Sequence, residues 1–220
     1  MLRLFSARLI LSGPGDLHDR LCACLLEARR FLDSISVADL MDILLIGRES
    51  RRSIVGCTGE GLHVGFIVPN EQATMEALGL AASKAGFCSG HSTFDSAIVA
   101  RELGELRGKS EVPTTIFKAY GNERDRCSKF VEVFIPKEEA RIVTTWIEQE
   151  VGTHIGLTLG NASDFQKVRH ALQAEGFRIP KFMNEEPMTN PLEGSTVLYF
   201  DRPDGEENLR IEILSAGSAF

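Results

Sequence analysis

The sequence has no run of lysine or arginine, and its formal net charge is −7 with a pI near 5.3. Binding to nucleic acid needs a basic surface that neutralises phosphates. We therefore expect no nucleic-acid partner. The chain also has no apolar run long enough to span a bilayer, so we expect no membrane partner.

Cysteines are few, and their spacing suggests no pairing. The five are Cys22, Cys24, Cys57, Cys88 and Cys127. An odd number without paired spacing is typical of reduced thiols in a reducing compartment. We therefore predict a cytoplasmic protein. The first fifteen residues carry two arginines and no acid, which weakly resembles an organelle transit peptide and makes an organellar location the alternative.

The composition is that of a globular protein with a sizeable core. Apolar residues make up 43% of the chain and charged residues 25%. Twenty glycines and eight prolines indicate many turns, as an α/β or α+β protein needs. The N-terminal part is helical in pattern, with apolar residues at helical spacing from Leu17 to Leu32 and a second short helix over residues 37–45.

Beyond Gly59 the chain contains an internal repeat. Residues 63–70 and 154–161 share the pattern histidine, β-branched residue, glycine, large apolar residue, and they end on asparagine. Each opening is followed by a predicted helix, and the two helices end at Gly86 and Gly176. Glycine just past the last helical turn is the usual C-cap, so the two copies keep nearly the same register.

Each copy closes on an apolar strand with a glutamate at its centre. These strands are predicted over residues 129–135, around Glu132, and 209–214, around Glu212. Another strand precedes each of them, at 114–120 and 196–201. The first copy is longer between residues 89 and 109, where we predict an extra helix over 94–106. The second strand of each copy is not visible in the pattern.

This organisation predicts four segments. They are a helical N-terminal extension (1–57), a first module (58–136), a connecting helix (137–152) and a second module (153–220). Because two modules are fused in one chain, one complete site can form within a monomer, and we expect a monomer or a homodimer.

Strand parity brings two histidines and two glutamates to equivalent places. Side chains along a strand alternate between faces, so His63 and His154 lie opposite the apolar face of their strands. The same parity holds for Glu132 and Glu212. The next residue on each histidine face is a glycine, which we expect to leave room beside each imidazole. A carboxylate in an apolar strand is costly without a partner.

These four residues are therefore our candidate metal ligands. Two imidazoles and two carboxylates suit Mn²⁺, Fe²⁺, Ni²⁺, Co²⁺ or Zn²⁺ and leave two coordination positions for water or a chelating substrate. Taken singly, each histidine would more often be a core or surface residue and each glutamate a solvated charge. Arg210 shares parity with Glu212, and we expect it either to meet an anionic substrate or to form an ion pair.

The repeat and its four ligand candidates resemble the vicinal-oxygen-chelate superfamily, which includes glyoxalase I, extradiol dioxygenases and methylmalonyl-CoA epimerase. The phrase at residues 200–205, followed by Asn208 and Glu212, is similar to that family's closing motif, although Arg202 lengthens the turn. The helical extension, the connecting helix and the segment 190–192 resemble the YecM-like branch, whose activity is unassigned.

The resemblance implies an α+β fold of two fused βαβββ modules that form an eight-stranded metal-binding cleft. It implies a divalent-metal-dependent enzyme with isomerase- or lyase-like chemistry on a small oxygen-chelating substrate, with Glu132 or Glu212 as catalytic general base. The alternatives are a non-catalytic small-molecule or metal-binding protein and an Fe(II) dioxygenase, which needs only two histidines and one carboxylate.

Overall fold

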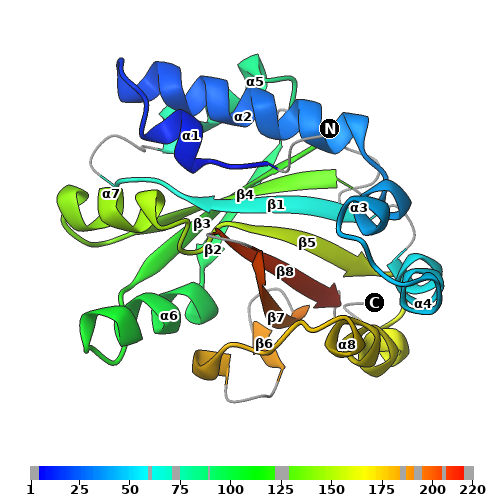
Figure 1. Ribbon diagram of the computed structural model, residues 1–220. Coiled ribbons are helices and arrows are strands. Elements are labelled where there is room, and N and C mark those ends of the chain that lie inside the picture. The colour runs from blue at the N-terminus through cyan, green and yellow to red at the C-terminus, as the bar shows by residue number, and fades with distance from the viewer. Residues whose placement is uncertain are drawn as a thin grey trace. The chain divides into compact units, whose positions relative to one another are not determined.

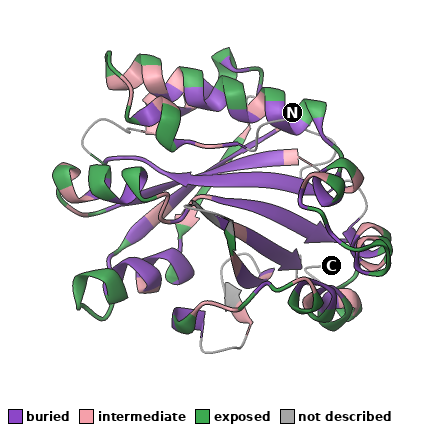
Figure 2. Cartoon of the chain, in the orientation of Figure 1, coloured by how far each residue is buried: buried purple, intermediate pink, exposed green. Residues whose placement is uncertain are grey.

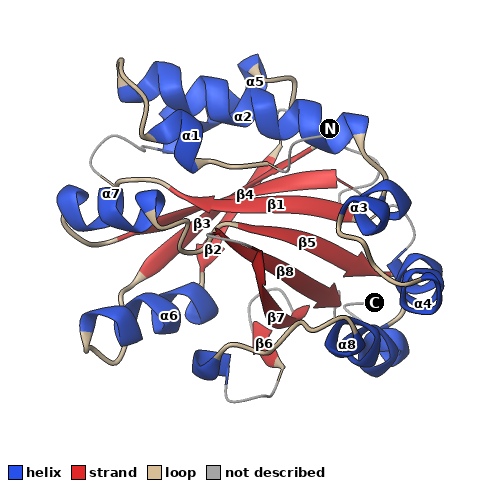
Figure 3. Cartoon of the chain, in the orientation of Figure 1, coloured by secondary structure: helices blue, strands red, loops and turns tan. Residues whose placement is uncertain are grey.

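A computed structural model gives an α+β fold for the chain (Figures 1 and 3). It describes residues 5–58, 61–70, 75–88, 90–121, 129–183, 187–190, 195–204 and 207–215. Cys127 and parts of the segments 184–194 and 200–205 lie outside these residues. None of the helices in the described ranges is long and apolar enough to cross a membrane.

The chain divides into two compact units, and each contains one βαβββ module. The first unit holds the chain up to Ser34 and Val64–Thr153, and the second holds Ile35–His63 and His154 onward. The strand order is β2-β3-β4-β1 in the first module and β5-β8-β7-β6 in the second. The opening strand therefore lies beside the closing strand in both, as the repeat predicts.

The first module contains one helix more than the second. Its elements are β1 (Leu62–Ile67), α5 (Met75–Lys84), β2 (His91–Asp95), α6 (Ala97–Arg107), β3 (Thr114–Tyr120) and β4 (Lys129–Pro136). The extra helix begins at Ala97 rather than at residue 94, because Ser96 caps it by accepting a hydrogen bond from the Val99 N–H. Phe94 belongs to β2, the strand that the sequence pattern did not reveal, and it pairs with Ile116 of β3.

The second module follows the same plan. Its elements are β5 (His154–Leu159), the short 3-10 helix η1 (Ala162–Asp164), α8 (Phe165–Ala174), the 3-10 helix η2 (Lys181–Met183), β6 (Met188–Asn190), β7 (Ser195–Asp204) and β8 (Glu207–Ser215). β5 and β8 pair in parallel, and β7 and β8 form an antiparallel pair that extends to Asp204 and Glu207. Residues 200–204 of the closing motif are thus part of a strand.

The C-termini of the two module helices have the same geometry. Gly86 and Gly176 have φ angles of 85° and 84°, which L side chains rarely adopt. The N–H of the following phenylalanine bonds five residues back in each case, from Phe87 to Ala82 and from Phe177 to Leu172. Both phenylalanines are buried. This matched Schellman-type end supports the duplication at a second place in each module.

Helices of the N-terminal part and the connecting helix belong to one unit or the other. They are α1 (Arg8–Leu11), α2 (Leu17–Ser34), α3 (Val37–Ile43), α4 (Arg48–Thr58) and α7 (Ala140–Glu148). In the first unit α2 contacts α5 and β4, and in the second unit α4 contacts α8 and β5. Each half of the predicted extension thus covers the helix of one module. The four segment boundaries stay predictions.

The opening strands are buried on both faces. Every residue of β1 and β5 is buried (Figure 2). Side chains along each of these strands therefore alternate between two buried faces, one that is apolar and one that carries the histidine. A polar side chain enclosed in this way needs a partner, and this requirement applies directly to His63 and His154.

Candidate metal centre

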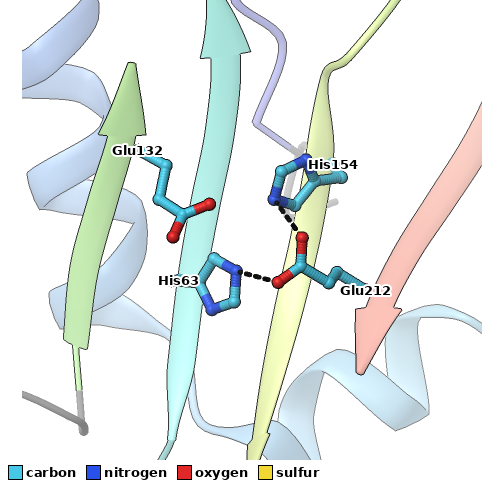
Figure 4. Close-up of side chains that lie close together, drawn as sticks. All are labelled: His63, Glu132, His154 and Glu212. Atoms are coloured by element: carbon cyan, nitrogen blue, oxygen red, sulfur yellow. Dashed lines mark ion pairs between the residues drawn. The ribbon is translucent and has the colours of Figure 1, made fainter. Parts of the chain in front are cut away.

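His63, His154 and Glu212 meet within the second unit. Glu212 Oε1 lies 3.2 Å from His63 Nε2, and Glu212 Oε2 lies 3.2 Å from His154 Nε2 (Figure 4). The side chains of both histidines are 0% exposed and that of Glu212 is 3% exposed. One carboxylate therefore faces two imidazoles in a site closed to bulk water.

The strand pairing of the second unit places these three residues. β5 and β8 run in parallel, with Gly156 opposite Glu212, so His154 precedes that pair by two residues on the same face. Gly61, just before β1, accepts a hydrogen bond from the Thr158 N–H of β5. This bond fixes the start of β1, and with it His63, beside β5.

Gly156 makes room for a histidine, but not for the one on its own strand. An ideal Cβ on Gly156 would overlap with the ring of His63. The sequence pattern assigned this space to His154, two residues away along β5. Cross-strand neighbours are closer than same-face neighbours along one strand, and the imidazole of the neighbouring strand therefore fills the gap.

Glu132, the fourth candidate, lies on β4 in the first unit and has a cationic partner. Its Oε1 is 3.1 Å from Lys118 Nζ, and both side chains are 7% exposed. Lys118 stands directly opposite Glu132 in the β3–β4 register. One signal for this contact is visible in the sequence, because Lys118 is the only charged residue of the predicted strand 114–120.

The three candidates of the second unit have donor atoms at metal-ligand spacing. Each histidine Nε2 is 3.2 Å from one oxygen of Glu212, and Glu132, in the first unit, is buried as they are. Atoms bound about 2.1 Å from one cation are about 3.0 Å apart at right angles and about 4.2 Å apart on opposite sides. The two 3.2 Å spacings are close to the right-angle value, so these three donors fit a divalent cation in both chemistry and size.

The two imidazoles lie close to each other, and a tyrosine ring lies beside His154. The rings of His63 and His154 lie 5.5 Å apart at 84°, and Tyr199 of β7 lies 5.3 Å from His154. Tyr199 stands opposite Glu212 in the β7–β8 register. Sequence reasoning missed Tyr199, because only the strand register brings it next to the candidate ligands.

Arg210 forms the ion pair that was one of its two expected roles. Its Nε donates to Asp201 Oδ1 at 2.7 Å, and its Nη2 donates to Asp201 Oδ2 at 3.0 Å. The guanidinium also lies 5.5 Å from the ring centroid of Phe182 and 5.2 Å from that of Tyr199. A bidentate pair against aromatic rings holds Arg210 in one orientation.

The other three histidines are not part of the candidate metal centre. His91 is exposed at the start of β2, and His170 is exposed on α8. His18 Nε2 is 3.7 Å from Cys22 Sγ in α2. Burial raises the pKa of the Cys24 thiol, with the charge of Glu27 adding to the effect. A thiol in that environment is inert.

Comparisons by sequence give no match. No family model matches this chain, and none of the curated proteins matches it.

Solved structures with a partly similar fold are known. A methylmalonyl-CoA epimerase variant of Streptomyces coelicolor, in complex with 2-nitronate-propionyl-CoA, is 19% identical, with 71% of this chain and 96% of that chain covered and a TM-score of 0.41. Methylmalonyl-CoA epimerase from Mycobacterium tuberculosis is 13% identical, with coverages of 71% and 88% and a TM-score of 0.42. A mutant 4-hydroxymandelate synthase from Streptomyces coelicolor is 9% identical, with coverages of 73% and 49% and a TM-score of 0.41. At these low scores the likeness supports no conclusion about activity.

Proposed function

We propose that this protein is a divalent-metal-dependent enzyme of the vicinal-oxygen-chelate type, with isomerase- or lyase-like chemistry on a small oxygen-chelating substrate. One observation carries the proposal: the two oxygens of the buried Glu212 each face Nε2 of a different buried histidine at 3.2 Å. We propose His63, Glu132, His154 and Glu212 as the metal ligands. The YecM-like branch is the proposed closer kinship.

The donor set limits what the site would do. A bound Mn²⁺, Fe²⁺, Ni²⁺, Co²⁺ or Zn²⁺ ion would supply Lewis-acid stabilisation of negative charge on a substrate oxygen. His63, Glu132, His154 and Glu212 would hold it. Glu132 is the carboxylate that we propose to leave the ion and act as general base, because Glu212 is held between both imidazoles.

The Lys118–Glu132 ion pair also favours a second candidate function. If Glu132 stays paired with Lys118 and does not bind the ion, the remaining ligands are His63, His154 and Glu212. Two histidines and one carboxylate are the usual ligand set of non-haem Fe(II) oxygenases. An Fe(II) dioxygenase is therefore the alternative enzyme, and the number of carboxylates that bind the ion separates the two.

Metal content and metal affinity test the proposal. Elemental analysis of the purified protein, followed by titration of the chelator-treated protein with Mn²⁺, Co²⁺, Ni²⁺ and Zn²⁺, should give one site per chain. His63→Ala and His154→Ala should each lower the affinity at least about tenfold. His170→Ala, which removes an exposed imidazole from α8 of the same unit, should leave it unchanged.

A substrate screen with and without chelator then tests catalysis. Turnover that is lost with chelator and in His63→Ala supports the enzyme. Activity that is unchanged by chelator and by His63→Ala would show that the proposal of a metal-dependent enzyme is wrong. Metal binding without any turnover supports the non-catalytic metal-binding protein instead.

A further inference from the structure

Lys118 and Glu132 form a buried ion pair within the first unit. The two residues face each other across β3 and β4, and their charged atoms are 3.1 Å apart. Burying an ammonium group is costly, and the cost is offset when an opposite charge and polarisable neighbours surround it. Lys118 Nζ lies 4.1 Å from the ring centroid of Phe130 and 5.9 Å from that of Phe94, distances at which cation–π attraction operates.

The repeat shows that the module does not need a lysine at this place. In the first module Lys118 stands opposite Glu132. In the second module the position opposite Glu212 is Tyr199. Both residues are buried, so either an aromatic ring or a lysine can pack there. The positive charge is therefore a property of the first module alone and calls for an explanation beyond packing.

A charge count supplies that explanation. The charges of a divalent cation and the carboxylates of Glu132 and Glu212 cancel when both imidazoles are neutral. The ammonium of Lys118 then gives the group a net positive charge. In a buried site an unbalanced charge strongly affects which ligands bind, because water screens it poorly.

We propose that Lys118 is a specificity-determining residue that selects negatively charged chelators, such as 2-oxo and 2-hydroxy carboxylates, over neutral α-hydroxyketones. This inference rests on the proposed metal site and narrows its substrate class. The positive charge of Lys118 has the opposite effect on the affinity for the metal cation, because Lys118 repels the cation and competes with the cation for Glu132. Lys118 should therefore weaken metal binding and strengthen anion binding.

These opposite effects make the test specific. Chelator-treated wild-type protein and Lys118→Met are first titrated with Co²⁺. The Co²⁺-loaded proteins are then titrated with oxalate or with dihydroxyacetone. The Co²⁺ absorption spectrum reports binding in both titrations. Lys118→Met should bind Co²⁺ about tenfold more tightly and oxalate about tenfold more weakly, with little change for neutral dihydroxyacetone. Lys109→Met, which removes an exposed lysine paired with Glu138, should change neither affinity.

Further variants separate charge from packing. Glu132→Gln raises the net charge by one, and the double variant Lys118→Met/Glu132→Gln restores the wild-type charge with a neutral pair. Oxalate affinity of the Co²⁺-saturated proteins should follow the charge, highest for Glu132→Gln, intermediate for wild type and the double variant, and lowest for Lys118→Met. Glu132→Gln and the double variant keep the test possible if Lys118→Met does not fold.

The outcomes distinguish this inference from the proposed function. If Lys118→Met weakens Co²⁺ and oxalate binding alike, or if oxalate affinity does not follow the charge, Lys118 has only a structural role and the inference is wrong. If the wild-type protein binds no divalent metal, the proposed function itself fails.

Discussion

Gly156 on β5 lies directly against the imidazole of His63 on β1, and an ideal Cβ at position 156 would overlap with that ring. Gly156→Ala should therefore push His63 out of place. We expect it to destabilise the fold by about 1–3 kcal/mol, the usual range for overpacking a buried site. Urea unfolding and Co²⁺ titration measure the change in stability and the accompanying loss of metal affinity.

A second glycine provides the matched control. Gly56 is exposed in the interior of α4, and nothing lies within 4 Å of a Cβ placed there. Gly56→Ala should stabilise the protein by about 0.5–1 kcal/mol, because alanine loses less backbone freedom on helix formation. If both variants shift stability in the same direction, Gly156 does not make room for His63.

The two glutamates should contribute unequally to metal binding. Glu212 faces both histidine Nε2 atoms, while Glu132 is shared with Lys118. We expect Glu212→Gln to lower Co²⁺ affinity about 10–100-fold and Glu132→Gln to lower it less. Calorimetric titration of both variants measures this difference. A larger loss in Glu132→Gln would show that the cation displaces Lys118 fully.

Arg210 and Asp201 should be coupled more strongly than an exposed pair with the same geometry. Arg51 and Asp42 also form two contacts, at 2.6 and 3.0 Å, but their side chains are 37% and 61% exposed, against 10% and 21% for Arg210 and Asp201. Double-mutant cycles with alanine should give about 0.2–1 kcal/mol for the exposed pair and about 1.5–3 kcal/mol for the enclosed one. Equal coupling energies would show that Arg210 is not held by Asp201 in solution.

Glu138 should make stability depend on pH in the acid range. Hydrogen bonds from Lys109, from the Glu139 backbone and from Arg107 lower its pKa from 4.5 to about 2. A carboxyl group with a lowered pKa in the folded state stabilises the protein above its unfolded pKa and loses this effect as the pH falls. Wild type should be more stable than Glu138→Gln at pH 7, and the difference should shrink below about pH 4.5 and vanish below about pH 2.

Urea unfolding of both proteins over this pH range measures the effect. High salt should reduce the difference at pH 7, because these charges lie near the surface. A difference that stays constant from pH 7 to pH 2 would show that the carboxylate charge of Glu138 does not contribute.

The sequence by itself determined which residues occupy equivalent places in the two modules. The matched openings, the helix ends at Gly86 and Gly176, and the period-2 pattern around Glu132 and Glu212 are local features, and local sterics and side-chain alternation make them readable. They led correctly to two βαβββ modules. The short strand β2 was missed because it is largely exposed and lacks an apolar pattern.

Only the tertiary structure decided which side chains touch. Strand parity gives the face on which a residue lies, but cross-strand register depends on pairing between segments far apart in the chain. That register places Lys118 against Glu132, Asp201 against Arg210 and Gly156 beside His63. The sequence thus supplied the candidate donors, while long-range strand pairing set their spacing and the charge beside them.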